Sequence, residues 1–406
     1  MTETATAPVP GDHIMGVYSR TPLAFERGEG ARLYTGDGTA YLDCMAGIAV
    51  NALGHAHPKL VRALKDQADR LWHVSNIFTI PGQEQLAKLI AEATFADVCF
   101  FTNSGAEAIE CAIKTARKHH WAKGQPERID IIGFEGSFHG RTIAAVNASG
   151  NEHYLEGFGP PLPGFTHLPF GDVDAIRAAV GPTTAAILLE PVQGEGGARA
   201  WPDADLTAIR RLCDETGTLL IYDEIQCGLG RTGKLFAYEW ADDAAPDIMA
   251  IAKALGGGFP VGACIATAEA ARGMVVGSHG STYGGNPLAM AVGKAAFEEL
   301  VKPELMAHVR EVAGYFTQQL TGLMQRYPDV VADIRGRGLL IGVKLKTPNR
   351  EFMQHAREER LLLAGGGDNC VRLLPPLILS IEDASEAMAK LERACEAARA
   401  KAKAAA

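Results

Sequence analysis

The chain has 406 residues, of which 47% are hydrophobic, and a formal net charge of −9. A chain of this length and apolar content can bury a large core, and two domains are expected rather than one. The sequence has no basic block that would indicate nucleic acid or an anionic membrane as a partner. It also has no apolar run near the ~20 residues of a membrane helix.

The cysteines and the first residues both indicate the cytosol. The eight cysteines are scattered and form no CxxC pair, which argues against a zinc site and against a secreted disulfide framework. The chain starts Met-Thr-Glu-Thr-Ala, with an acid and no apolar segment, unlike a signal peptide. We therefore expect a soluble cytoplasmic enzyme that holds no metal ion.

The first predicted elements are a tail, a hairpin and a helix. Residues 1–12 are small, polar and proline-bearing, as in a flexible tail. Residues 33–43 fit a β-hairpin with a glycine-containing turn. His55 and His57 have no acid or cysteine at metal-ligand spacing, so we assign them packing and turn roles. Pro58 then opens an amphipathic helix that extends to about residue 71.

A strand predicted at residues 98–102 is followed by a polar turn and a helix. Ser104 and Glu107 have the spacing of a capping box, which closes the start of a helix. The amides and the hydroxyl at a helix start also form a site for a phosphate group. The two interpretations are compatible, because the geometry that caps the helix also forms the anion site.

Two further strands lead into polar loops. The strand at 129–134 precedes Phe138, which could lie on a heteroaromatic ring, and Arg141, which could bind a carboxylate. Taken alone, a phenylalanine such as Phe138 is more often a core residue, and an arginine such as Arg141 is more often a surface ion-pair partner. The buried strand at 185–189 ends in Glu190 and a glycine-rich loop that contains Glu195. Such strand ends mark the edge where open α/β sheets bind ligands.

The most informative stretch runs from residue 219 to residue 260. Residues 219–222 are a continuous apolar run, as in a strand buried on both faces of a parallel sheet, and Asp223 follows. A second apolar stretch, 248–252, leads to Lys253 and three glycines that permit close backbone approach. An acid that keeps a pyridinium nitrogen protonated and a lysine that forms a Schiff base are the groups that a pyridoxal phosphate (PLP) enzyme needs most.

The same stretch contains two glycine patterns with other meanings. Residues 228–233 spell GxGxxG and residues 228–234 spell GxxxxGK. A dinucleotide-binding turn should open a helix directly, whereas residues 235–240 are a poor helix start. A P-loop needs Ser or Thr after its lysine, and position 235 is leucine. An NAD-dependent dehydrogenase is therefore only a remote alternative.

The last third of the chain predicts a helical connection and a small α/β domain. Ser281 and Thr282 lie in a polar turn and could bind a phosphate or a substrate, or serve as ordinary turn residues. Arg372 could reach across a domain cleft or form a structural ion pair. Helical spacing runs from 287 to about 327 with a break near Pro303. The elements predicted after it are strand, helix, strand and helix, at 338–345, about 350–360, 371–374 and from about 381.

Together the motifs resemble those of the class III, or ornithine-type, PLP-dependent aminotransferases, and look most like bacterial acetylornithine aminotransferases. The similarity spans nearly the whole chain and includes FTNSGAEAIECAIK, FHGRT, EPVQGEGG, LLIYDEIQCGLGRTGKLFA, KALGGGFP, GSHGSTYGGNPLA and RLLPPL. It implies an α/β protein of the PLP-dependent aminotransferase fold type I, in which a large domain has a mostly parallel seven-stranded sheet. The implied segments are 13–55 (small domain, N-terminal part), 56–295 (large PLP-binding domain) and 296–406 (small domain, C-terminal part).

The resemblance also implies roles for single residues. Lys253 would bind the aldehyde of PLP and shuttle a proton, and Asp223 would keep the ring nitrogen protonated. Further cofactor-binding residues would be Ser104, Gly105, Ala106, Phe138, Glu224, Ile225, Gln226 and, from the neighbouring subunit of a homodimer, Thr282. The substrate-binding residues would be Arg141, Ser281, Glu195 and Arg372. Ala106 departs from the threonine of many members, which removes a hydroxyl contact to the phosphate but keeps the amide.

The implied reaction moves the terminal amino group of N2-acetyl-L-ornithine to 2-oxoglutarate in arginine biosynthesis, giving N-acetyl-L-glutamate 5-semialdehyde and L-glutamate. Glu195 would neutralise Arg372 in the first half-reaction and would move away when 2-oxoglutarate arrives. Alternative substrates in the family are N-succinyldiaminopimelate, N-succinylornithine, ornithine and 4-aminobutyrate. These alternatives stay open, because a pocket distinguishes similar substrate chains by only ~1–3 kcal/mol per group. A non-catalytic binding protein is disfavoured, since binding alone needs no Schiff-base lysine.

Overall fold

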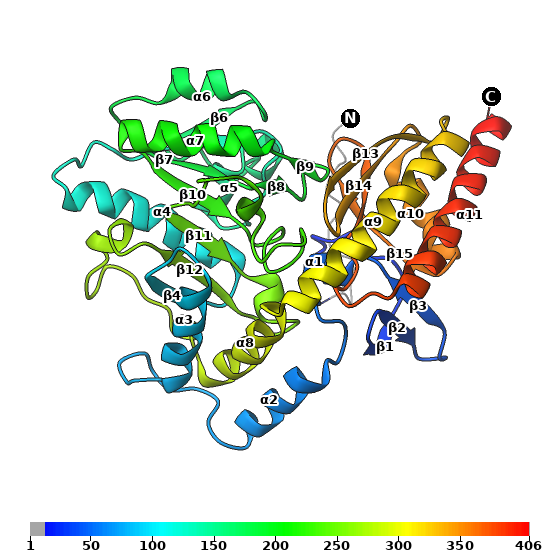
Figure 1. The fold of residues 1–406 in the computed structure, drawn as a ribbon, viewed down its shortest axis with the longest axis horizontal. Coiled ribbons are helices and arrows are strands. Elements are labelled where there is room, and N and C mark those ends of the chain that lie inside the picture. Colours follow the sequence, from blue (N-terminus) through cyan, green and yellow to red (C-terminus); the bar gives the residue numbers. More distant parts are fainter. Residues whose placement is uncertain (1–12, 406) are drawn as a thin grey trace.

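The computed structural model describes residues 13–405, so the tail predicted at 1–12 lies outside the described residues. Figure 1 shows a larger and a smaller body side by side. The chain passes from the larger to the smaller body through α8 (Pro287–Leu300) and α9 (Pro303–Arg326). This confirms the predicted helical region and its break at Pro303, whose fixed φ suits the first position of a new helix.

The larger body is built on a mixed sheet of seven strands in the order β4-β12-β11-β10-β7-β5-β6. Only β12 runs antiparallel to its neighbours, so the mostly parallel seven-stranded sheet is confirmed. The strands are β4 (Val98–Thr102), β5 (Asp130–Phe134), β6 (Phe165–Leu168), β7 (Thr184–Leu189), β10 (Leu219–Asp223), β11 (Ile248–Ile251) and β12 (Gly262–Ala266).

The central strands are apolar throughout because both of their faces are covered. Successive side chains of a strand point to opposite faces, and in β10 Leu220 and Tyr222 join one hydrophobic core while Leu219 and Ile221 join another. The second core contains the predicted apolar face of α4 (Gly105–Ala122), and the first contains residues of α7 (Asp203–Thr216). The other helices of this body are α2 (Pro58–Ala68), α3 (Pro81–Ala93), α5 (Ile143–Ala148) and α6 (Val173–Ala179).

The smaller body combines both ends of the chain. Strand β15 (Leu361–Leu362) pairs in parallel with β3 (Ala40–Asp43), and Arg32 donates hydrogen bonds of 2.7 Å to Asp383 and to Glu386 on α11 (Ile381–Ala405). The domain boundaries at 55/56 and 295/296 stay predictions. One four-stranded sheet of the smaller body contains β1 (Phe25–Glu29), β2 (Arg32–Thr35), β3 (Ala40–Asp43) and β15 (Leu361–Leu362). The second four-stranded sheet of the smaller body contains β13 (Val331–Arg337), β14 (Leu340–Leu345), β16 (Ala364–Gly366) and β17 (Cys370–Leu373). The helices of this body are α10 (Asn349–Glu358) and α11 (Ile381–Ala405).

Two local predictions need correction. β13 was absent from the predicted elements, because its sequence VADIRGR is largely polar and most of its residues stay partly or fully exposed. The capping box at α4 is only half formed. The Ser104 hydroxyl accepts a hydrogen bond from the Glu107 amide, but the Glu107 carboxylate accepts from the amide of Asn103 rather than from that of Ser104.

Within residues 13–405, no helix is both long and apolar enough to span a bilayer.

Candidate active site

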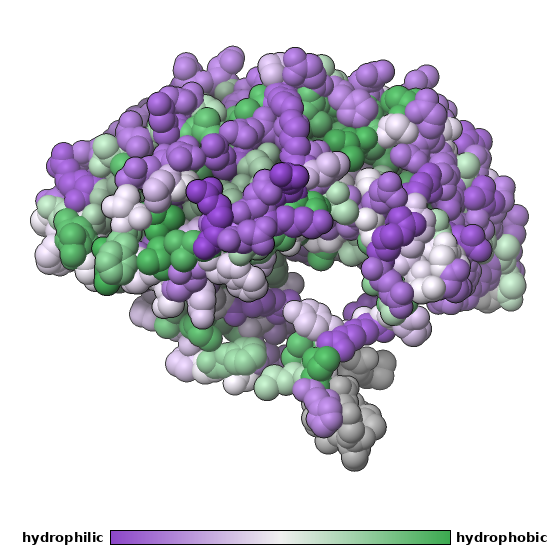
Figure 2. Space-filling model, turned by 90° about the horizontal axis from the view of Figure 1, so that it is seen from below, coloured by the Kyte–Doolittle hydropathy of each residue, from purple (hydrophilic) through white to green (hydrophobic). Residues whose placement is uncertain are grey.

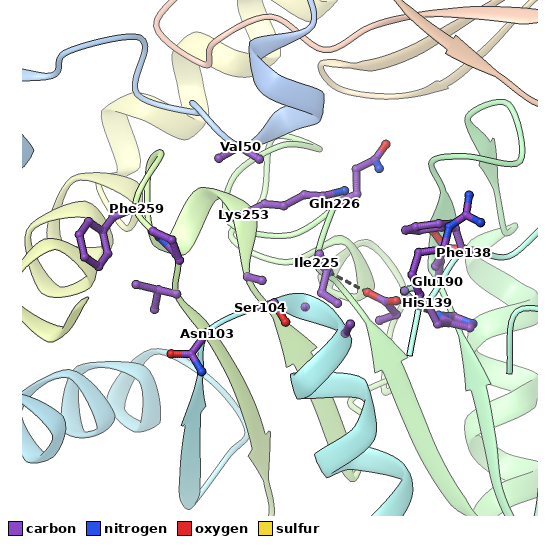
Figure 3. Close-up of a pocket in the computed structure, with 18 of the residues that line it drawn as sticks. Val50, Asn103, Ser104, Phe138, His139, Glu190, Ile225, Gln226, Lys253 and Phe259 are labelled. Atoms are coloured by element: carbon purple, nitrogen blue, oxygen red, sulfur yellow. Dashed lines mark hydrogen bonds and ion pairs between the residues drawn. The ribbon is translucent and has the colours of Figure 1, made fainter. Parts of the chain in front are cut away.

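A cavity of about 430 Å³ lies at the carboxyl edge of the large sheet (Figure 3). It is bordered by residues that follow β4, β5, β7, β10 and β11 and by the start of α4. Open α/β sheets bind ligands at this edge. The cavity brings together Ser104, Gly105, Ala106, Phe138, Arg141, Asp223, Ile225, Gln226 and Lys253 from the predicted site, and it also includes Val50, Asn103, His139 and Glu190.

Lys253 stands just after β11, with its side chain in the cavity. Figure 3 shows the side chain extending between Val50 and Ile225 toward Gln226. Its backbone has φ of 45°, a conformation that non-glycine residues adopt rarely and that is often found at functional sites. No hydrogen bond or ion pair joins its amine to another of residues 13–405. Removal from water lowers the pKa of this amine, which favours its neutral, nucleophilic form.

Asp223 is the last residue of β10 and is paired in register with Ala250 of β11. This pairing places Asp223 close to Lys253, which follows β11. Its carboxylate is buried, lies 2.8 Å from Nδ1 of His139 and accepts a hydrogen bond from the Ile225 amide. Burial alone would lower the pKa of His139, but the hydrogen bond and charge of Asp223 raise it above the usual value. This favours an imidazolium that holds the Asp223 carboxylate in place.

Two buried groups beside Asp223 were not assigned a role from sequence. His139 follows Phe138 in the quoted motif FHGRT, which was its only sequence signal, and its partner lies 84 positions away. Glu190 accepts hydrogen bonds from the amides of Phe138 (3.1 Å) and Gly194 (3.2 Å), so it holds two cavity loops together. Burial raises the pKa of Glu190 to about 7.

The start of α4 presents free backbone donors to the cavity. Ser104 is the N-cap, and the amides of Gly105 and Ala106 lie in the first turn, where a helix offers no acceptor of its own. None of the other residues from 13 to 405 accepts from them. A Cβ at Gly105 would lie 2.7 Å from Cδ1 of Ile225, so a larger residue there would force the Ile225 side chain to shift. The site therefore suits a phosphate group.

Glu195 and Arg372 form an ion pair between the two bodies. Arg372 of β17 is buried and donates to both carboxylate oxygens of Glu195, at 2.7 and 2.9 Å. It also donates at 2.9 Å to Oε1 of Gln226, which lines the cavity. The pair thus contacts a residue that lines the cavity, and Glu195 compensates the charge of the Arg372 guanidinium.

Glu224 is placed away from the predicted cofactor site. Its side chain accepts hydrogen bonds from the amides of Ala237 and Tyr238 and does not line the cavity. Because side chains alternate in direction where β10 ends, Asp223 and Glu224 point to opposite sides. Burial raises the pKa of Glu224 to about 8. Its position indicates that it holds residues 237–238 in place.

Ser281 and Thr282 do not line the cavity of their own chain. The Ser281 hydroxyl accepts from the Gly284 amide at 2.9 Å and lies 3.4 Å from Nδ2 of Asn103, while Thr282 is exposed. The predicted contacts of Ser281 with substrate and of Thr282 with the phosphate stay predictions.

The GxGxxG pattern does not form a dinucleotide-binding turn. After β10 the chain runs through residues 224–236 to a short 3-10 helix at Ala237–Trp240, so no α-helix opens on the glycines.

The cavity fits PLP. It holds an amine without a protein partner, a buried carboxylate, a helix start with free amides and, between them, Phe138 and Ile225 as candidates to cover the ring faces. On the carboxyl edge of a mostly parallel seven-stranded sheet, these features define a PLP-dependent enzyme of fold type I.

Comparison with known proteins specifies the class further. Residues 15–395 match the model of the class III aminotransferases. Acetylornithine aminotransferase 2 of Caulobacter vibrioides is 69% identical over 401 residues, which are 98% of this chain and 99% of the relative. The crystal structure of N-acetylornithine aminotransferase from Stenotrophomonas maltophilia is similar with a TM-score of 0.83 and 37% identity, covering 95% of this chain and 98% of the other. An ornithine aminotransferase of Toxoplasma gondii with partial occupancy of PLP at its active site has a TM-score of 0.91 and 32% identity, over 96% and 94% of the chains.

The chain therefore belongs to the class III aminotransferases, and it is a PLP-dependent transaminase.

Proposed function

We propose that the protein transfers the terminal amino group of N2-acetyl-L-ornithine to 2-oxoglutarate, giving N-acetyl-L-glutamate 5-semialdehyde and L-glutamate in arginine biosynthesis. The observation that carries this proposal is the closed Glu195–Arg372 pair beside the Lys253 cavity. A neutralised Arg372 leaves Arg141 as the cation available for the carboxylate of an ω-amine whose reacting end lies at Lys253. The high identity to a protein named acetylornithine aminotransferase supports this substrate.

The residues that hold PLP in this proposal surround the cavity. Lys253 would bind its aldehyde, and Asp223 would hold the proton on its ring nitrogen. When bound, PLP supplies an electron-accepting ring that stabilises negative charge at the amine-bearing carbon. The α4 amides would hold the phosphate, and Phe138, Ile225 and Gln226, which line the cavity, would contact the ring faces and the phenolic oxygen.

Lys253 also moves the reacting proton. Its amine has a lowered pKa because it is removed from water, so it can accept a proton from the amine-bearing carbon of the substrate and return it. Arg141 binds the carboxylate of acetylornithine through its free N–H groups. For 2-oxoglutarate, Glu195 swings away and Arg372 takes the α-carboxylate.

A half-reaction screen tests the substrate. The PLP form is mixed with N-acetylornithine, N-succinyldiaminopimelate, N-succinylornithine, ornithine and 4-aminobutyrate, and the loss of its visible absorption band is followed. We expect N-acetylornithine to react with the highest second-order rate constant. A faster reaction with one of the other four amines would contradict the acetylornithine assignment while leaving the aminotransferase class intact.

Replacing Glu195 by glutamine is expected to shift preference between the two substrates. Without the counter-charge, Arg372 is free to bind a carboxylate in both half-reactions, and a charged hydrogen bond of this kind contributes about 1.5–3 kcal/mol. The ratio of kcat/KM for glutamate to that for acetylornithine should therefore rise by about 10- to 100-fold. Glu156→Gln, in an exposed loop, is the matched control. An unchanged ratio in Glu195→Gln would show that the pair does not switch.

We also propose that the active enzyme is a cytoplasmic homodimer in which Thr282 of the neighbouring subunit contacts the phosphate. Segments 71–78 and 275–284 lie together, since Asn76 donates hydrogen bonds to the carbonyls of Ser281 and Gly284. These segments expose large apolar side chains, and Figure 2 shows hydrophobic residues at the surface of the larger body. The exposed residues are Leu71, Trp72, Ile77, Phe78, Val275, Val276 and Tyr283. Light scattering should give twice the mass of one chain, and a monomeric mass for active enzyme would contradict the dimer.

A further inference from the structure

Arg141 is held by aromatic rings rather than by an acid. Its guanidinium carbon lies 3.6 Å from the ring centroid of Tyr154 and 5.7 Å from that of Phe138. No hydrogen bond or ion pair connects its side chain to any other residue between 13 and 405. All of its N–H donors therefore remain available to a ligand.

Tyr154 links the two cavity residues Arg141 and Phe138. Its ring stands edge-to-face on Phe138, with centroids 6.1 Å apart and an interplanar angle of 90°. It ends the short 3-10 helix Glu152–Tyr154, in a loop that is anchored where the Leu162 amide donates to Oδ1 of Asn147 at 2.8 Å. Tyr154 is half-buried, while its neighbour His153 is exposed.

This contact leaves the guanidinium oriented and open. A ring that stacks on the face of a guanidinium occupies no N–H donor, because the donors project from the edge of the plane. Arg141 is otherwise exposed, and a free arginine at a surface samples many rotamers, which weakens its binding of a carboxylate. A stacked ring removes part of this cost before the substrate arrives.

We propose that Tyr154 is a positioning residue that holds Arg141 at the cavity for the carboxylate of the amine substrate. This inference rests on the proposed function, because it assumes a substrate with a carboxylate at the end remote from the reacting amine. Tyr154 thereby favours amino acids over simple amines.

Paired substrates test the role of Tyr154. N-acetyl-L-ornithine and N-acetylputrescine differ only by the carboxylate. For Tyr154→Ala we expect KM for acetylornithine to rise about 3- to 30-fold, with kcat little changed. This increase in KM corresponds to the loss of the binding free energy that a cation–π contact contributes. The KM for acetylputrescine should stay within about twofold, because it has no carboxylate for Arg141 to bind. Tyr154→Phe, which keeps the ring, should behave as wild type, and so should His153→Ala as the loop control.

Two further measurements separate positioning from folding. Calorimetric binding of N-acetyl-L-norvaline, which has the carboxylate but no reacting amine, should weaken in Tyr154→Ala. The double variant Arg141→Ala/Tyr154→Ala should be no worse than Arg141→Ala alone, because Tyr154 acts through Arg141. Equal losses on both substrates, a Tyr154→Phe variant as poor as Tyr154→Ala, or additive losses would overturn the inference. If wild type prefers another of the five amines, the proposed function fails, and the same test is made with that amine and its counterpart without the carboxylate.

Discussion

Replacement of Lys253 by alanine is expected to abolish transamination, with kcat reduced by at least about 10³-fold, because general acid–base catalysis alone contributes ~10²- to 10⁴-fold. Lys253 is the amine that opens into the cavity, and removal from water lowers its pKa. The variant loses both the group that holds the cofactor covalently and the group that moves the proton. The phosphate site at α4 stays intact, so PLP should still bind without a covalent link.

Borohydride reduction followed by mass spectrometry distinguishes these two losses. Wild type should gain the mass of reduced PLP on the peptide that contains Lys253, whereas Lys253→Ala should gain none. Lys346→Ala, at an exposed position in the smaller body, is the control and should be labelled and active like wild type. Residual turnover of Lys253→Ala within tenfold of wild type, or labelling at another lysine, would contradict the assignment.

The placement of Asp223 and Lys253 at one cavity could be predicted because their signals are local. An apolar run that ends in Asp223 and a second one that leads to Lys253 indicate two buried parallel strands, and β10 and β11 are adjacent in the sheet. Parallel neighbours end at the same edge, so both side chains reach one cavity. The same argument places Ser104, because β4 runs parallel to β11 with β12 between them.

Contacts between distant segments could not be derived from local patterns. The His139–Asp223 contact spans 84 positions and the Glu195–Arg372 pair spans 177, and neither distance leaves a trace in periodicity. Only the resemblance to known aminotransferases indicated the second pair. Glu224 was placed among the cofactor-binding residues because a motif gives the order of residues but not the side to which each points once β10 ends.

Replacement of Asp223 by asparagine is expected to lower kcat by about 10³-fold. Opposite unit charges about 4 Å apart interact with about 4 kcal/mol at an effective dielectric constant of ~20. The variant removes the negative charge that would keep the ring nitrogen of PLP protonated, and a loss of ~4 kcal/mol corresponds to about 10³-fold in rate. Asparagine has nearly the same shape and retains hydrogen-bonding capacity toward His139 and the Ile225 amide. The fold and the phosphate site should therefore persist.

Two companion variants separate charge from position at Asp223. Asp223→Glu keeps the charge but moves it, and should retain more activity than Asp223→Asn if charge is the main contribution. His139→Asn removes the group that holds the carboxylate, and its loss should be smaller, because Asp223 keeps its hydrogen bond from the Ile225 amide. Rates are measured as single turnovers with acetylornithine, alongside the absorption spectrum of bound PLP, which reports the protonation of the ring. An Asp223→Asn enzyme with an unchanged spectrum and a rate within tenfold of wild type would show that Asp223 does not pair with the ring nitrogen.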